Sequence, residues 1–263
     1  MKRLVGTELK KYFKDPDKVT SWWKPEEGPY KFWHEQEFKI LDKYVKVEPS
    51  WRILDAACGQ GRFARYYAKK GARVQALDIN PKMLQIARER SEQEGIRGNI
   101  DFFEGDVETF SRNEQEFDIV TCMDALDHMD DLNLAIKNLV KPLKKNGLFI
   151  TTYTSTESFY GFLRDVYTLF AYRSRDAEVD IGKAYTFIEI KEACAAAGIH
   201  IEHVFGIGLV MAPQERVRFP LFVNRFFEFL SRLDIGMKPY HADGFFATRC
   251  SGVMLIGRRD VRA

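Results

Sequence analysis

Short apolar runs alternate with amphipathic helical patterns along the middle of this chain, and this alternation limits the folds open to it. Apolar runs typical of buried strands occur at residues 52–57, 73–78, 100–106, 117–123 and 148–153. Segments with helical periodicity lie between them, at 62–71, 80–95 and 131–147. Strands that alternate with helices form a parallel sheet covered on both faces and joined by right-handed crossovers. The pattern predicts an α/β fold with a doubly wound, mostly parallel sheet, whose ligand site lies beyond the carboxyl ends of the strands.

Further strands and less regular segments complete the predicted domain. A helix at 188–198 and strands at 199–206 and 250–259 bring the predicted sheet to seven strands. Residues 1–30 are polar with interspersed aromatics, and KPEEGP interrupts regular structure there, so a helix is predicted only at 30–45. We predict a single domain, 1–263, made of an N-terminal helical cap (1–50), a ligand-binding core (51–153), two insertions (154–185 and 207–249) and a closing strand (250–259).

The composition excludes several classes of protein and site. The formal net charge is +2 over 263 residues, which is too small to indicate nucleic-acid binding. The five His are scattered without metal-ligand spacing, so we expect no metal site. The four Cys are far apart, which favours reduced thiols and a cytoplasmic location. We expect neither a secretory signal nor a membrane span, because no apolar stretch approaches about 20 residues.

The stretch ILDAACGQGRFA, residues 53–64, is typical of a strand that ends in a glycine-rich loop and opens onto a helix. Gly59, Gly61 and Ala64 fit the pattern G-x-G-x-x-G/A, and Asp78 follows about 20 residues later at the end of the next strand. Glycines let a backbone approach a ligand closely, and a carboxylate at that position accepts hydrogen bonds from ribose hydroxyls. These features fit either a dinucleotide or S-adenosylmethionine.

Additional acidic residues favour S-adenosylmethionine. Asp55 lies just before Gly59, where it would repel a pyrophosphate dianion but attract the ammonium and sulfonium groups of S-adenosylmethionine. Asp106 ends the third strand, where its carboxylate can accept from an adenine amino group. A dehydrogenase of this type also needs a second domain for its substrate, and only the two insertions are left over for one.

The motifs together resemble those of the class I S-adenosylmethionine-dependent methyltransferases, whose fold is Rossmann-like. LDAACGQG, DINPKML, EGDVETF, FDIVTCMDALDHMDD and LVKPLKKNGLFI are similar to the first to fifth motifs of that family. The resemblance covers residues 31–153 well and the closing strands loosely. It is strongest to the small-molecule group that includes the quinone-biosynthesis methyltransferases. One departure is Ala57, where the family most often has glycine, and alanine is tolerated if its φ angle stays negative.

The resemblance implies a role for each cofactor-binding residue. The methionine moiety would be lined by Asp55, Ala57, Gly59 and Gly61. The ribose would be held by Asp78, and the adenine would contact Ile79, Met83, Asp106 and Val107. The floor of the pocket would be formed by Met123 and Asp124. Purely structural interpretations stay open for three of these residues: Met83 as core, Asp106 as a helix N-cap and Asp55 as a turn former.

Methyl transfer depends strongly on orientation, and it needs a base only where the accepting atom must lose a proton. His128, just after the fourth strand, is the candidate base because an imidazole titrates near neutral pH. The alternative is that His128 only packs beside the cofactor. Asp124 and Asp127 are weaker candidates, since carboxylates are poor bases unless they are desolvated. Cys122 lies within an apolar strand, so we interpret it as a buried structural thiol rather than a nucleophile.

Two aromatic segments with interspersed arginines, 158–173 and 219–233, lie in the insertions and are predicted as helices. They fit a lid over a large apolar substrate with an acidic group, a shallow peripheral contact with a membrane surface, or packing on each other or on a second subunit in a homodimer. An N-terminal aromatic cluster either closes the same pocket or forms a packed cap. Its members are Trp22, Trp23, Tyr30, Trp33 and His34.

The sequence therefore predicts an S-adenosylmethionine-dependent methyltransferase that acts at oxygen or carbon of a small, apolar or lipid-like molecule. The expected cofactor is S-adenosyl-L-methionine, and the expected partner is a small-molecule substrate without nucleic acid. Two alternatives come from other classes: an NAD(P)-dependent oxidoreductase, and a non-catalytic binding or assembly protein with the same fold. Asp55 and Asp106 argue against the oxidoreductase, and the intact glycines and acids argue against a protein that has lost activity.

Overall fold

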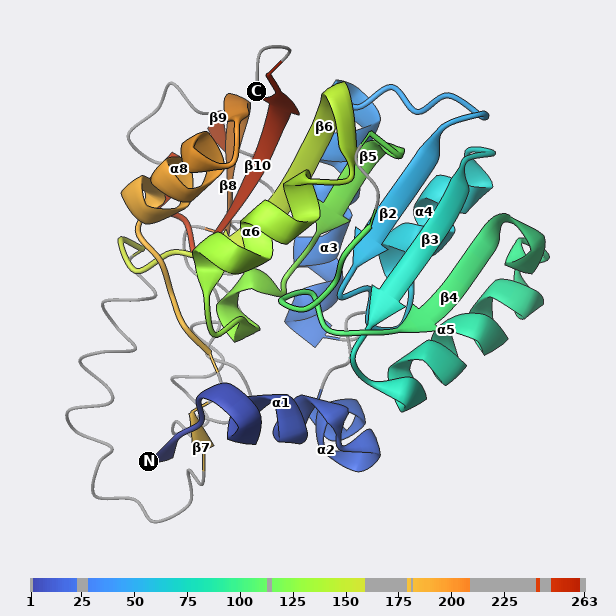
Figure 1. Cartoon of the computed structure of the whole chain (residues 1–263), viewed down its shortest axis with the longest axis horizontal. Coiled ribbons are helices and arrows are strands. Elements are labelled where there is room, and N and C mark those ends of the chain that lie inside the picture. Colours follow the sequence, from blue (N-terminus) through green and yellow to red (C-terminus); the bar gives the residue numbers. More distant parts are fainter. Residues whose placement is uncertain are drawn as a thin grey trace.

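A mixed β-sheet with helices on both faces forms the centre of the molecule (Figure 1). The structure is a computed structural model that describes residues 2–22, 28–112, 115–158, 179–180, 182–208, 240–241 and 247–260. Within these residues the strand order of the central sheet is β4-β3-β2-β5-β6-β10-β8-β9. A separate small sheet pairs β1 (Lys2–Arg3) with β7 (Val179–Asp180) in parallel.

Five strands of the central sheet run parallel. They are β2 (Arg52–Ala56), β3 (Arg73–Asp78), β4 (Ile100–Glu104), β5 (Phe117–Cys122) and β6 (Leu143–Thr154). β10 (Gly252–Arg259) is antiparallel to both β6 and β8 (Ile199–Ile207). The seven predicted strands and the doubly wound arrangement are therefore confirmed. β9 (Tyr240–His241) adds a two-residue strand beside β8 at the edge of the sheet.

The sheet separates the hydrophobic core into two layers, each covered by helices. α3 (Gly28–Tyr44) and α4 (Arg62–Lys69) cover one face, where Leu41 and Tyr67 are buried against Ile53. α6 (Leu132–Val140) and α8 (Phe187–Ala196) cover the other face, where Leu139 packs in the same cluster as Leu54. Consecutive residues of a strand point to opposite faces, which is why neighbours in β2 belong to different layers. α5 (Pro81–Gln93) begins at Pro81 and is capped by Asn80, as predicted.

The boundary between α6 and β6 differs from the prediction. The helix predicted over 131–147 ends at Val140, because Pro142 cannot donate a backbone hydrogen bond and blocks a further helical turn. Leu143 then pairs with Phe117 of β5. The register shifts after this pair, and regular pairing resumes at Leu148. The strand predicted from residue 148 is therefore preceded by an irregular start at Leu143.

Two helices precede the predicted cap helix. α1 (Gly6–Lys14) and α2 (Pro16–Trp22) lie below the sheet in Figure 1, next to the ends of β3 and α5. The side chain of Asp15 accepts hydrogen bonds from the backbone N–H groups of Asp17 and Lys18, at 3.1 and 3.4 Å. Asp15 followed by Pro16 is therefore a helix start, a signal that the prediction of a single helix overlooked.

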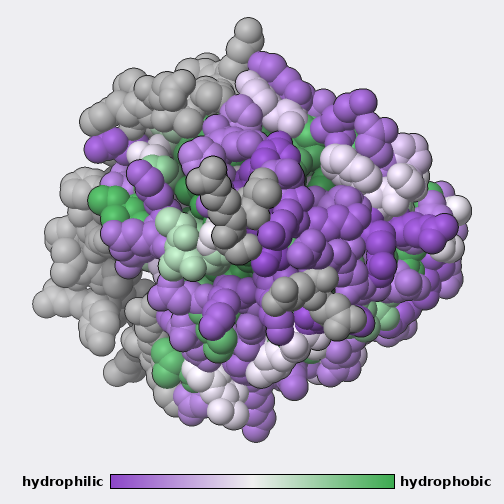
Figure 2. Space-filling view, turned by 45° about the horizontal axis from the view of Figure 1, so that its top comes forward, coloured by the Kyte–Doolittle hydropathy of each residue, from purple (hydrophilic) through white to green (hydrophobic). Residues whose placement is uncertain are grey.

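Hydrophilic residues predominate on the face of the molecule shown in Figure 2, where hydrophobic residues form only small separate patches. Among the described residues, no helix is both long and apolar enough to span a membrane. Apart from Ser158, the aromatic segments 158–173 and 219–233 lie outside the described residues, and so do the side chains of Trp22, Trp23 and Tyr30.

Candidate functional site

A pocket opens at the carboxyl ends of β2, β3 and β5, the edge of the sheet where the sequence predicts the ligand site. Its wall contains all the predicted cofactor-site residues except Gly61, together with the predicted base His128. Lys10, Phe13 and Val19 of α1 and α2 complete the wall from the N-terminal side. Residues from five separate parts of the chain therefore converge on one cavity.

The glycine loop has a left-handed backbone at three positions. The φ angle is 54° at Ala57, 54° at Gly59 and 72° at Gly61. Ala57 therefore does not keep the negative φ that alanine favours, and its backbone is strained. Gly61 is the N-cap of α4, and a Cβ there would lie 2.9 Å from the Cβ of Ala87 in α5. Gly61 thus allows close packing of α4 and α5, and it does not line the pocket, so its predicted contact with a ligand stays a prediction.

Asp55 is held at the end of β2, with 1% of its surface exposed. One carboxylate oxygen accepts from the backbone N–H of Ala64 in α4 at 2.9 Å, and the other accepts from the Thr121 hydroxyl at 3.0 Å. Burial raises the pKa of Asp55 to about 7, although these hydrogen bonds oppose the shift. Asp55 therefore ties the start of α4 to β5 and also places a titratable carboxyl in the pocket wall.

Asp78 is held in the same way at the end of β3. Its two carboxylate oxygens accept from the backbone N–H groups of Gly59, at 2.7 Å, and of Asn80, at 2.8 Å. Burial raises its pKa to about 6. The bond to Gly59 fixes the glycine loop against the neighbouring strand, so that Asp78 and the loop form one rigid unit.

Asp106 lies across the pocket from the glycine loop and contacts the N-terminal helix. Its Oδ1 accepts from the backbone N–H of Glu108 at 3.0 Å, and its Oδ2 forms an ion pair with Nζ of Lys10 at 2.7 Å. Lys10 also pairs with Glu108 at 3.2 Å. Burial alone would lower the pKa of Lys10, but the bonds to both acids raise it. Asp106 caps a turn rather than the helix proposed for it as a structural alternative.

Apolar side chains line the space between these acids. Met83, Val107 and Met123 are buried and reach the pocket, and Ile79 reaches it from a half-buried position. Met83 is 1% exposed, so it serves both as core and as pocket wall. A flat apolar group can therefore be enclosed beside the acids.

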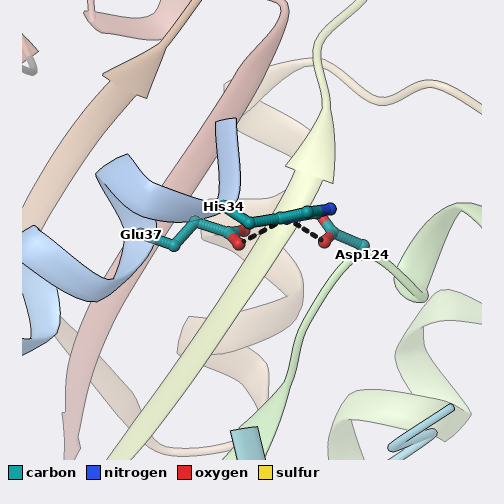
Figure 3. Close-up of side chains that lie close together, drawn as sticks. All are labelled: His34, Glu37 and Asp124. Carbon is teal, nitrogen blue, oxygen red and sulfur yellow. Dashed lines mark hydrogen bonds and ion pairs between the residues drawn. The ribbon is translucent and has the colours of Figure 1, made fainter. Parts of the chain in front are cut away.

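A cluster of buried charged residues lies at the end of β5 and includes Asp124, a predicted site residue. Nδ1 of His34 in α3 lies 2.9 Å from Oε2 of Glu37 and 3.6 Å from Oδ2 of Asp124 (Figure 3). The guanidinium of Arg62 donates to both carboxylates, to Glu37 at 2.7 Å and to Asp124 at 2.6 Å. Burial raises the pKa of Glu37 and of Asp124, and Arg62 opposes both shifts.

The same cluster has the residue types of a metal site. The ligand-type atoms of His34, Glu37 and Asp124 lie within 4.8 Å of one another. Arg62, however, already bonds both carboxylates and supplies the positive charge that two buried acids require. The geometry is that of an arginine-centred ion network joining α3, α4 and the end of β5.

His128 and Asp127 lie in a short 3₁₀ helix, η2 (Leu126–His128), but they face different surroundings. The His128 ring reaches the pocket and lies 4.6 Å from the ring of Phe13, measured between centroids. Asp127 instead accepts from the backbone N–H and the hydroxyl of Thr154 in β6. Asp127 therefore anchors η2 to the sheet, and only His128 is placed beside the pocket.

Comparison with known proteins identifies the family. Residues 53–147 match a family described as a methyltransferase domain. A ubiquinone biosynthesis O-methyltransferase of Actinobacillus pleuropneumoniae is 31% identical over 170 residues, which cover 61% of this chain and 70% of that protein. The chain belongs to the methyltransferase family.

Other matches define how far this similarity extends. The corresponding O-methyltransferase of Coxiella burnetii is 30% identical over 139 residues, so the match spans 52% of this chain and only 58% of that relative's length. Among solved structures, the [4+2]-cyclase SpnF superposes with a TM-score of 0.64 at 15% identity, covering 99% of both chains. The fold is therefore shared along the whole length with a protein named for a different reaction.

Four residues at or beside the pocket were not predicted as part of the site: Lys10, Phe13 and Arg62, which line it, and Glu37, which pairs with Arg62. Lys10 and Phe13 belong to a helix that was not predicted, although the Asp15–Pro16 helix start was visible. Arg62 was interpreted only as the start of the helix after the glycine loop, and Glu37 as part of a cap helix. Their association with Asp124 joins residues 25 and 62 positions apart in the sequence, and no local pattern encodes it.

Proposed function

We propose that this methyltransferase binds S-adenosylmethionine in the pocket and transfers its methyl group to an oxygen of a small, lipid-like molecule. The observation that carries the proposal is the excess of acid in the pocket wall. Two basic side chains, Lys10 and Arg62, line the pocket beside five carboxyl groups, which belong to Asp55, Asp78, Asp106, Glu108 and Asp124.

Both cations are already engaged. Lys10 pairs with Asp106 and Glu108, and Arg62 pairs with Asp124 and with Glu37. Asp55 and Asp78 form no ion pair within the described part of the chain, and burial raises the pKa of each. A cationic ligand would favour the ionised carboxylates, whereas the pyrophosphate of a dinucleotide would be repelled. The charge balance thus supports S-adenosylmethionine and opposes the oxidoreductase alternative.

The remaining wall suits the rest of this cofactor. Met83, Ile79 and Val107 offer an apolar slot for a purine, and Asp78 offers carboxylate oxygens at the offset expected for a ribose contact. When bound, S-adenosylmethionine supplies an electrophilic methyl group on a sulfonium. Asp55, Asp78 and the glycine loop would hold and orient it, and correct orientation alone can lower the barrier of such reactions by up to roughly 7–11 kcal/mol.

His128 is the residue proposed to accept the proton of a substrate hydroxyl. Its ring reaches the pocket beside Met129 and Asp124, at the end of β5. Phe13 packs against the ring and limits its orientation. The names of the relatives, ubiquinone biosynthesis O-methyltransferases, support a hydroxylated and lipid-like acceptor. A hydroxyl becomes a useful nucleophile only when its proton can be removed as the bond forms.

Calorimetric titration with S-adenosylhomocysteine and with NADH tests the cofactor. Micromolar binding of S-adenosylhomocysteine, weakened at least tenfold in Asp78→Asn, is the expected result. The matched control is Asp101→Asn, an exposed acid on the neighbouring strand β4 that does not line the pocket. Binding of NADH but not of S-adenosylhomocysteine would refute the proposal and restore the oxidoreductase alternative.

Methyl transfer is then tested with hydroxylated aromatic compounds that do or do not carry an alkyl chain. Transfer of labelled methyl to the compounds with an alkyl chain, at a strongly reduced rate in His128→Gln, would support both the acceptor class and the base. Cofactor binding without transfer to any acceptor would favour the non-catalytic alternative.

We also propose a cytoplasmic location. All four cysteines are free thiols, and Cys122, Cys194 and Cys250 are buried. Unpaired thiols of this kind are typical of reducing compartments. Detection of the protein in the cytosolic fraction of its cells, with all four thiols alkylatable after unfolding, is the expected result.

A further inference from the structure

The N-terminal arm, defined here as residues 2–22 with β1, α1 and α2, forms one wall of the pocket. Lys10, Phe13 and Val19 all line the cavity, facing the glycine loop and the strand ends. In Figure 1 the arm lies across the carboxyl ends of the strands, below β3 and α5. A ligand in the pocket would therefore be enclosed between the sheet and the arm.

Lys10 is the charged contact between the arm and the adenine end of the pocket. Its ammonium lies 2.7 Å from Oδ2 of Asp106 and 3.2 Å from Oε2 of Glu108. Glu108 in turn accepts from the backbone N–H of Asp131 at 2.6 Å, so its carboxylate is fixed from the other side. One ammonium thus spans two immobilised acids, one of which is the predicted adenine contact.

Asn80 connects the arm to the ribose end. Its backbone N–H donates to Asp78 at 2.8 Å, while its side-chain amide donates to the carbonyl oxygens of Phe13, at 2.7 Å, and Asp15, at 3.2 Å. The same side chain accepts from the first turn of α5. The arm therefore contacts Asp106, the predicted adenine contact, directly through Lys10. It contacts Asp78, the predicted ribose contact, indirectly through Asn80.

The arm is attached by few apolar contacts. Within residues 4–20, only Leu9 and Val19 are buried hydrophobic side chains. α1 has nine residues and α2 has seven, which is too short for either helix to be stable without docking. Segments with little buried apolar surface open most readily from a folded protein. Release of the arm can thus occur without unfolding the sheet.

From these contacts we propose that the arm is the movable wall of the cofactor pocket and that Lys10 holds it closed over the bound cofactor. The proposal rests on the proposed function for the identity of the ligand. The cofactor enters and leaves when two sets of bonds open: those from Lys10 to Asp106 and Glu108, and those from the Asn80 side chain to the arm. With these bonds closed, Phe13 and Val19 cover the pocket and Asp106 is held in place for the adenine amino group. Lys10 is a positioning residue for Asp106 and sets the lifetime of the complex.

The test combines the dissociation rate of S-adenosylhomocysteine with hydrogen exchange of the arm, in the full chain. Lys10→Met should release S-adenosylhomocysteine roughly fivefold faster, the change expected for loss of a partly exposed ion network. Saturating S-adenosylhomocysteine should slow exchange of the amides of α1 and α2 in the wild type, and less so in Lys10→Met. Lys10→Arg, which keeps the charge, should restore most of the wild-type lifetime.

Lys11→Met is the matched control, because Lys11 is an exposed neighbour on the same helix and does not line the pocket. A dissociation rate in Lys10→Met equal to that in Lys11→Met would overturn the proposal. Exchange of α1 and α2 that is unchanged by S-adenosylhomocysteine would overturn it as well. Failure of the wild type to bind S-adenosylhomocysteine would be a separate result, because it refutes the proposed cofactor itself.

Discussion

Ala57 is the residue at which the glycine loop is most strained. Its φ angle of 54° lies in the left-handed region, which costs a non-glycine residue about 1–2 kcal/mol. Ala57→Gly should therefore raise the free energy of unfolding by about 1 kcal/mol, after allowance for the greater flexibility of the unfolded chain. Thermal unfolding should show a midpoint about 2–4 °C higher. Ala68→Gly, a change at a buried position in the last turn of α4, should lower the midpoint. A fall in both variants would contradict the strain assigned to Ala57.

Asp55 should make stability depend on pH in the direction set by its burial. Its pKa is about 7 in the folded protein, against an ordinary value of 3.8 for an exposed aspartate. The neutral carboxyl of Asp55 therefore makes its full contribution to the free energy of unfolding below about pH 4. This contribution is lost as the pH rises through about 7, because the unfolded chain releases the proton more readily than the folded protein. At about 1.4 kcal/mol per pKa unit, the loss is at most roughly 4 kcal/mol.

Chemical denaturation between pH 4 and pH 8 measures this loss for wild type and for Asp55→Asn. The variant keeps a carbonyl oxygen for the Ala64 backbone N–H and an amide that the Thr121 hydroxyl can accept from. Its free energy of unfolding should fall less than that of the wild type over this range. Parallel pH profiles for the two proteins would show that Asp55 is ionised throughout.

At the scale of helices and strands, the sequence predicts the elements that have a regular apolar pattern, and it does not predict those that lack one. The strands of the core were predicted because each is an apolar run beside a helical pattern, and Asp55 and Asp78 because they occupy strand ends. α1 and α2 were not predicted, because they are short, polar and bury few side chains. The contact of Trp33 with Gly252, where a Cβ would lie 1.9 Å from the indole, joins α3 to β10 and has no local signature.

The arginine-centred network should be strongly coupled, because it joins α3, α4 and the end of β5 through buried charges. Arg62→Met leaves Glu37 and Asp124 buried without their cation and should destabilise the protein by about 3–5 kcal/mol. Arg62→Met combined with Glu37→Met should recover part of that loss, since one of the uncompensated acids is removed. Urea denaturation of the wild type, both single variants and the double variant gives the coupling energy.

A surface ion pair supplies the reference for this cycle. Arg258 pairs with Glu202 on exposed parts of β10 and β8, so Arg258→Met should cost no more than about 1 kcal/mol. Similar losses for Arg62→Met and Arg258→Met would mean that solvent reaches the buried network and screens it.

For the whole molecule, the site is built where separate layers meet. The sheet presents Asp55, Asp78 and Asp124 at one edge. α4 brings a buried cation to Asp124, and the N-terminal arm brings another cation to Asp106. The arm is also tied to the segment before α8, since β1 pairs with β7. Closure of the pocket is thus linked to a part of the chain that is distant in sequence. Bound cofactor should therefore stabilise the sheet, the arm and this segment together.

Cofactor binding and protonation should therefore be linked across the molecule. Asp78, with a pKa of about 6, and Asp55, with a pKa of about 7, are partly protonated in mildly acidic solution. A cationic ligand and ribose hydroxyls both favour the ionised forms, so binding at low pH must release protons. The affinity for S-adenosylmethionine should rise from pH 5 to pH 8, by up to about tenfold per pH unit for each proton released.

Asp78→Asn should bind S-adenosylmethionine more weakly, and its affinity should change less steeply with pH. Calorimetry in buffers of different ionisation enthalpy counts the protons, and an affinity independent of pH would show that neither carboxyl changes its charge on binding.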